Sequence, residues 1–189
     1  MNVGLKYRET LFSPSEAAAI TGLSLHLQRD WRSQGLLRAR EGGRASFSPR
    51  ELAEMRVMVR LRGLGLPLPQ ARHAAERAAP SVVWVALSEH PEATIAVDGA
   101  QETADAYLAS LDRSTDSTYL LTLAEVDINA SRYRHAVVVE GECTLEPALN
   151  DDVLDETTEV AGIVNLWAVA RAIAMATPRP LFTLVPPRN

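Results

Sequence analysis

The chain has 189 residues, 47% of them hydrophobic and 23% charged, which is the composition of an ordinary globular protein with enough apolar residues for a core. The whole chain has a net charge of −5. Residues 1–79 carry 13 Arg or Lys against 7 Asp or Glu, whereas residues 80–189 carry 6 against 17. This asymmetry suggests a basic surface for an acidic partner, joined to an acidic module with another role, and the single cysteine excludes an internal disulfide and indicates a cytoplasmic protein.

Two short helices are predicted near the N-terminus. Ser13 is expected to cap the first, over residues 14–20, because a proline follows it and an acid three residues later completes a capping box. Gly22 is expected to end this helix, and Ser24 to cap a second one over residues 25–33. Two helices separated by about three residues, with a glycine in the turn, are typical of a helix-turn-helix.

The second helix carries an apolar stripe. Leu23, Leu27 and Trp31 follow one another at intervals of four residues, so we expect them to be buried together. The other faces of the helix are then expected to present polar side chains, which are His26, Gln28, Arg29, Asp30 and Arg32.

A hairpin is predicted over residues 36–47, with a pair of glycines at its turn. A second cap-and-proline signature at Ser48 opens a third helix, and a fourth is predicted over residues 68–79, where Pro80 is expected to end it. The order of helix, turn, helix, hairpin, helix and helix predicts a winged helix-turn-helix domain over residues 1–79.

Residues 80–189 alternate between strand-like and helix-like runs, which predicts a mixed α+β domain. Its strands are predicted at residues 93–97, 119–126, 136–139 and 181–185. Its helices are predicted at residues 101–111 and 158–175. The helix predicted over residues 158–175 is apolar on all sides and is expected to be buried, either in the domain core or in a subunit interface. The acidic run over residues 151–159 is expected to interact favourably with the positive N-terminal end of that helix dipole, or to bind a cation or a basic partner.

Landmark residues recur in order through the first part of the chain: Phe12-Ser13, Glu16, Ala18, Thr21-Gly22-Leu23-Ser24, Arg29, Trp31, Gly35-Leu36-Leu37, Phe47-Ser48, Glu51-Leu52, Leu61-Arg62 and Leu64-Gly65-Leu66. This part resembles the DNA-binding domain of the MerR family of transcription regulators. The resemblance covers less than half of the chain. It implies a homodimer that binds operator DNA, with the second helix of each protomer in a major groove and the wings on flanking phosphates.

Four features depart from the family pattern. Asp30 replaces an aromatic residue, and its charge would repel phosphate unless it accepts a hydrogen bond from Arg29, Arg32 or a cytosine amino group. Gln28 stands where the family has an aliphatic residue, so Leu27 is expected to take the core place. Arg44-Ala45 reverses the usual order of an aromatic residue and an arginine in the wing. No heptad run follows residue 79, so the dimer must form without the usual coiled coil.

The predicted DNA contacts fall into two classes. His26, Gln28 and Arg29 are expected to read bases, because they are long enough to reach base edges and stand on the early turns of the second helix. Contacts with phosphates are expected from the arginines of the helix end and the hairpin, which are Arg32, Arg38, Arg40 and Arg44. The alternative is that these side chains are only solvated.

No catalytic, cofactor or metal site is predicted. The four histidines are scattered, no phosphate-binding loop is present, and Cys143 is expected to be buried or idle rather than a thiol sensor. No signal peptide or membrane span is expected. We expect RNA polymerase, a small molecule or a protein effector as partners of residues 80–189. Two rival functions remain open: an architectural protein for phage excision or packaging, and a protein-interaction module with the helix-turn-helix as its docking element.

Overall fold

The computed structural model describes residues 5–37, 45–111, 118–126, 132–149 and 160–187. Within these residues the chain folds into eight helices and two three-stranded sheets, which confirms the predicted α+β class. The helices are α1 (Pro14–Thr21), α2 (Leu25–Ser33), α3 (Pro49–Gly63), α4 (Leu68–Glu89), α5 (Pro91–Thr94), α6 (Gln101–Ser110), α7 (Thr118–Ala124) and α8 (Leu166–Ala176). The strands are β1 (Tyr7–Glu9), β2 (Ile95–Val97), β3 (His135–Val139), β4 (Glu142–Glu146), β5 (Ala161–Asn165) and β6 (Phe182–Leu184).

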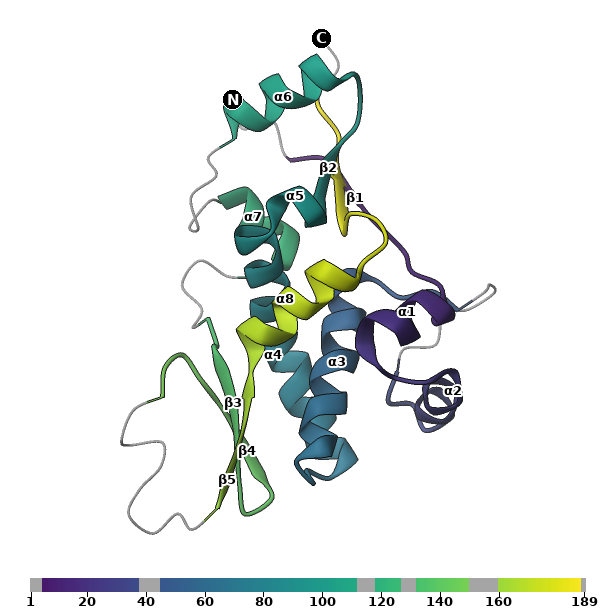
Figure 1. Ribbon diagram of the computed structural model, residues 1–189, viewed down its shortest axis with the longest axis vertical. Helices are drawn as coiled ribbons and strands as arrows, with labels where there is room; N and C mark the ends of the chain where they lie inside the picture. The colour runs from purple at the N-terminus through teal and green to yellow at the C-terminus, as the bar shows by residue number, and fades with distance from the viewer. Residues whose placement is uncertain (1–4, 38–44, 112–117, 127–131, 150–159, 188–189) are drawn as a thin grey trace.

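Helices α3, α4 and α8 form the centre of the molecule, with α1 and α2 on one flank (Figure 1). α4 packs against α3, α7 and α8, and α8 also contacts α1. One cluster of buried apolar side chains runs from Phe12 in the first helical region to Leu184 in the last strand. The N-terminal helices and the C-terminal helix therefore share a continuous core.

The two sheets have different topologies. In the first, β6 lies between β1 and β2, antiparallel to β1 and parallel to β2, so that Phe182 pairs with both Glu9 and Ile95. In the second, β3 lies between β4 and β5 and is antiparallel to both. The first sheet joins a strand near the N-terminus to a strand near the C-terminus, which brings both ends of the described chain together.

The helix starts predicted in the N-terminal region are confirmed. Ser13 and Ser48 each cap a helix through a complete capping box, in which the backbone N–H donates to the glutamate three residues later at 2.7 Å. Both helices begin with a proline, whose missing N–H costs nothing at that position. These local interactions explain why the starts are legible in the sequence.

The predicted end of the fourth helix is wrong, because α4 continues through Pro80 to Glu89. An interior proline costs about 3 kcal/mol. The following turns bury Val82, Val83, Val85 and Leu87, at roughly 1.5–3 kcal/mol for each side chain. Burial of this apolar surface thus outweighs the proline. The predicted division between residues 79 and 80 falls inside α4.

Two further elements differ from the prediction. The strand predicted over residues 119–126 is the helix α7, whose leucines and alanine favour helix and are buried on more than one side. The helix predicted over residues 158–175 begins only at Leu166, because residues 161–165 pair with β3 as strand β5. Asn165 then caps α8 by accepting hydrogen bonds from the N–H groups of Trp167 and Ala168.

Candidate nucleic-acid interface

The turn between α1 and α2 is fixed by short-range hydrogen bonds. Gly22 adopts the left-handed conformation at φ +78°, which ends α1 and which other residues rarely adopt. The hydroxyl of Thr21 donates to the carbonyl of Ala17 at 2.6 Å and accepts from the N–H of Leu23 at 3.1 Å. Ser24 caps α2, as predicted, by accepting from the N–H of Leu27. α2 is therefore held at a defined angle to α1.

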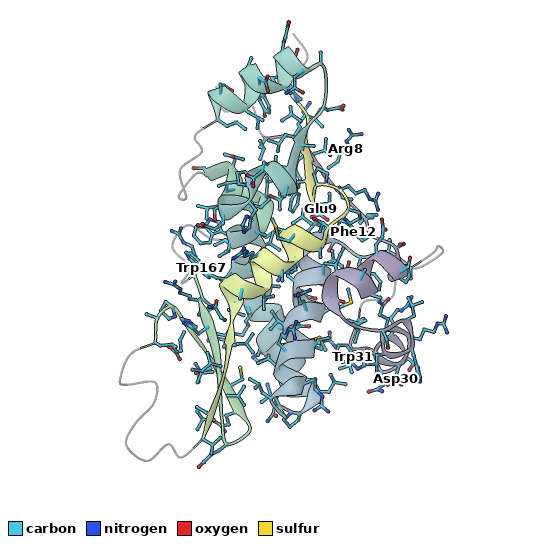
Figure 2. All side chains as sticks on the ribbon, viewed as in Figure 1. Arg8, Glu9, Phe12, Asp30, Trp31 and Trp167 are labelled. Atoms are coloured by element: carbon cyan, nitrogen blue, oxygen red, sulfur yellow. The ribbon has the colours of Figure 1, made fainter. Side chains whose placement is uncertain are left out.

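The buried side of α2 differs from the predicted stripe. Gln28 is fully buried and Trp31 nearly so, whereas the side chain of Leu27 is 43% exposed. Figure 2 shows α2 at the edge of the molecule with Trp31 on its inner side. Leu23 precedes the cap at Ser24 and is not part of the helix, and within α2 the buried face is set by Gln28 and Trp31, which are three residues apart.

Gln28 is therefore not available as a base-reading residue, and its prediction as a DNA contact is wrong for this structure. Its side-chain amide donates to the carbonyls of Pro14 and Leu23, at 3.0 and 2.9 Å. Its Oε1 is buried and has no hydrogen-bond partner among the described atoms. Gln28 acts as a bridge between α1 and α2, in the core position where the sequence placed Leu27. The cap at Ser24 was the signal that could have corrected the register.

The exposed side of α2 carries two of the predicted contacts. His26 and Arg29 are exposed, as are the apolar side chains of Leu25 and Leu27. Arg29 forms no ion pair with any residue that the structure describes. The outer face of α2 thus combines an exposed guanidinium, which has no ion pair among the described residues, with an imidazole and two leucines.

Arg32 and Asp30, in the last turns of α2, are both partly buried. Arg32 is half-buried, and its Nε has no hydrogen-bond partner among the described atoms. Asp30 pairs with neither Arg29 nor Arg32 through its carboxylate, and its label in Figure 2 lies on the outer side of α2. Neither of these two arginines therefore neutralises the charge of Asp30 through an ion pair.

The predicted contacts Arg38, Arg40 and Arg44 lie outside the described residues. The segments on either side of them are anchored. Phe47 pairs with Phe12 through two backbone hydrogen bonds, and Arg72 donates to the carbonyl of Gly35 at 2.6 Å.

Arg50 on α3 is engaged with carboxylates. It pairs with Glu54 at 3.3 Å and with Glu125 at 2.5 Å. Burial lowers the pKa of Arg50, but hydrogen bonds to Glu125 and Glu54 outweigh it, so that the pKa lies above its ordinary value. Arg50 is therefore occupied by two carboxylates, one of them on its own helix.

The described residues contain no group of three or more His, Cys, Asp or Glu that could hold a metal ion. Cys143 is half-buried, and burial raises the pKa of its thiol above the ordinary value. None of the described helices is long and apolar enough to cross a membrane.

Two comparisons with known proteins bear on this arrangement. Residues 12–78 match the sequence model of a family described as MerR HTH family regulatory protein. The matched segment begins at Phe12, just before the cap of α1, and ends within α4, so it includes α1, α2 and α3 entirely. The rest of the chain is assigned to no family. No curated protein matches the chain.

Proposed function

Residues 12–78 form a MerR HTH family domain, which implies DNA-binding transcriptional regulation, and from this premise we propose that the protein binds operator DNA as a homodimer. In this proposal α2 of each protomer enters a major groove. The observation that carries it is the outer face of α2, where Arg29 and His26 are exposed on a helix that is capped and anchored from its other side. The protein is then a regulator rather than an enzyme.

The base-reading role falls to Arg29 and His26. Arginine suits the O6 and N7 acceptors of guanine, and the absence of a described acidic partner leaves its fork available. Leu27, in the outward place expected of Gln28, suits the methyl group of thymine. Asp30 is suited to accept from a cytosine amino group, so a half-site containing guanine, thymine and cytosine is the expected preference.

Affinity is proposed to come mainly from arginine–phosphate contacts that release counterions. Arg32 at the end of α2 and the hairpin residues Arg38, Arg40 and Arg44 would supply them. Phosphate contacts set the register of a protein on DNA but carry no sequence information. Binding is therefore expected to weaken steeply as the salt concentration rises.

Residues 80–189 are proposed to supply dimerisation and the contact with RNA polymerase or with a small-molecule or protein effector, in the cytoplasm. No heptad repeat follows the MerR HTH domain, so a coiled coil does not account for the dimer. The excess of acidic residues in this part disfavours its direct contact with DNA.

Selection of bound sequences from a random duplex pool tests the proposal. A dimer is expected to enrich two symmetric half-sites separated by about one helical turn, or a multiple of it. Arg29→Ala is expected to lose about 10- to 100-fold in affinity for the selected site, with little change on random duplex. Arg40→Ala should weaken binding to both duplexes alike. Equal losses on both duplexes for the two variants, or an unenriched pool, would refute the proposal.

A further inference from the structure

A pocket of about 470 Å³ lies between α3, β5 and α8, and none of the described residues predicted to contact DNA lines it. Its volume falls within the range of roughly 300–1,000 Å³ that is usual for small-molecule sites. The three elements meet where β5 passes directly into α8 beside the second half of α3 (Figure 1). α3 belongs to the MerR HTH domain, whereas β5 and α8 lie far outside it in sequence.

Two arginines of α3 line this pocket one helical turn apart, Arg56 and Arg60. Neither forms an ion pair with a carboxylate of any described residue. One amino group of Arg56 donates to the carbonyl of Ile20, but its Nε is buried without a hydrogen-bond partner among the described atoms. A buried donor without an acceptor is unfavourable, because it has lost its hydrogen bonds to water. Among the described residues the carbonyl of Ile20 is therefore the acceptor that Arg56 has, and the rest of its guanidinium can donate to an anion in the pocket.

The electrostatic setting of Arg56 points the same way. Burial, and next the positive charge of Arg60, lower the pKa of Arg56 from its ordinary value. Both effects disfavour the charged guanidinium, and an anion bound between the two arginines would offset both. The rest of the lining is mostly apolar, with Val59, Val164 and Val169 facing the same space.

We propose that this pocket binds a small organic carboxylate. Its charged group pairs with Arg60 and Arg56, and its apolar body packs against the three valines. A planar carboxylate matches the fork of a guanidinium and accepts two of its hydrogen bonds. An inorganic anion has no apolar body and would leave the valine-lined part of the pocket unfilled.

The same contact links the pocket to the helix-turn-helix, and this half of the inference rests on the proposed function. Ile20, which accepts from Arg56, lies in the last turn of α1, immediately before the turn that leads into α2. A carboxylate that draws the Arg56 guanidinium toward Arg60 is expected to weaken its hydrogen bond to the carbonyl of Ile20. Ligand binding is therefore expected to move the end of α1, to change the position of α2 and so to change the affinity for DNA.

Direct binding to the full-length protein tests the site without DNA. Ligand-observed NMR would titrate 2-naphthoate, 4-phenylbutyrate and octanoate, each against its neutral primary amide. We expect at least one carboxylate to bind, with its amide at least 5-fold weaker. Arg60→Gln should weaken that carboxylate at least 5-fold, whereas Arg171→Gln, which removes an exposed arginine outside the pocket on α8, should change it less than 2-fold. Ala168→Leu, which narrows the pocket without removing a charge, should also weaken binding.

Three results would overturn the carboxylate site: no carboxylate binding below 10 mM, equal binding of acid and amide, or the same affinity in Arg60→Gln as in the wild type. The link to DNA is measured separately, as the affinity for the selected duplex with and without the bound carboxylate. A change of at least 3-fold that disappears in Arg60→Gln supports the link, and an unchanged affinity refutes it. Failure of duplex binding itself would refute the proposed function while leaving the NMR result intact.

Discussion

Helices α2 and α8 are of similar length, but they bury very different amounts of apolar surface. α8 buries Leu166, Val169 and Ile173 together with two alanines, whereas α2 buries only Gln28 and Trp31. At roughly 1.5–3 kcal/mol for each large apolar side chain, α8 gains about 5–9 kcal/mol from burial and α2 about a third of that. The difference shows that α8 is part of the framework, while most of the surface of α2 is left free for a partner.

The largest effect is expected from a charge in the middle of α8. Ala170 is fully buried, so Ala170→Asp places a carboxylate in the core without a partner and should cost about 4 kcal/mol or more in stability. Ala168→Asp, on an exposed position near the start of the same helix, is the matched control and should cost less than about 1 kcal/mol. Urea denaturation followed by circular dichroism measures both. Similar losses for the two variants would mean that α8 is not central to the core.

An intermediate effect is expected at Gln28, which separates structure from DNA contact within α2. Gln28→Ala removes two hydrogen bonds and leaves the buried carbonyl of Leu23 without its side-chain partner, for a loss of about 2 kcal/mol. Leu27→Ala, one residue away and exposed, should change stability by less than about 0.5 kcal/mol but alter the selected DNA sequence. Thermal denaturation and duplex selection are measured on both variants. The assignment fails if Leu27→Ala destabilises more than Gln28→Ala.

The smallest effect concerns the link between α1 and the segment that follows α8. Hydrogen bonds from the N–H of Ser13 and from its hydroxyl, and then the charge of Arg179, lower the pKa of Glu16. Arg179 lies 2.9 Å from that carboxylate and also stacks on the ring of Phe12, which Figure 2 shows beside the end of α8. The stability that the ionised Glu16 contributes is therefore present above its unfolded pKa and is lost as the pH falls through the lower folded value.

Glu16→Gln keeps an oxygen for the capping box but removes the charge. It should cost about 0.5–1 kcal/mol at pH 7, and the difference from the wild type should disappear on acidification below the folded pKa. Denaturation curves at a series of pH values measure this. A difference that stays constant from pH 7 to pH 3 would exclude the charge as its source.

Within the N-terminal region, short-range chemistry made the helices predictable. Ser13 and Ser48 satisfy backbone N–H groups within three residues, and Gly22 supplies a backbone conformation that few residues adopt. The helix-turn-helix and the exposed position of Arg29 follow from these signals. The burial of Gln28 does not, because its two acceptors belong to the start of α1 and to the residue before the cap.

The sequence by itself thus determined the starts of α1 to α4, the α+β class and the exposed position of Arg29 on α2, because caps, prolines and glycines act over a few residues. Tertiary packing decided the continuation of α4 past Pro80, the helical state of α7 and the change from β5 to α8. An apolar run of four to eight residues suits a strand or a buried helix equally, and only the partner that covers it selects one. The pocket of Arg56 and Arg60 depends in the same way on β5 and α8, which lie about a hundred residues further along the chain.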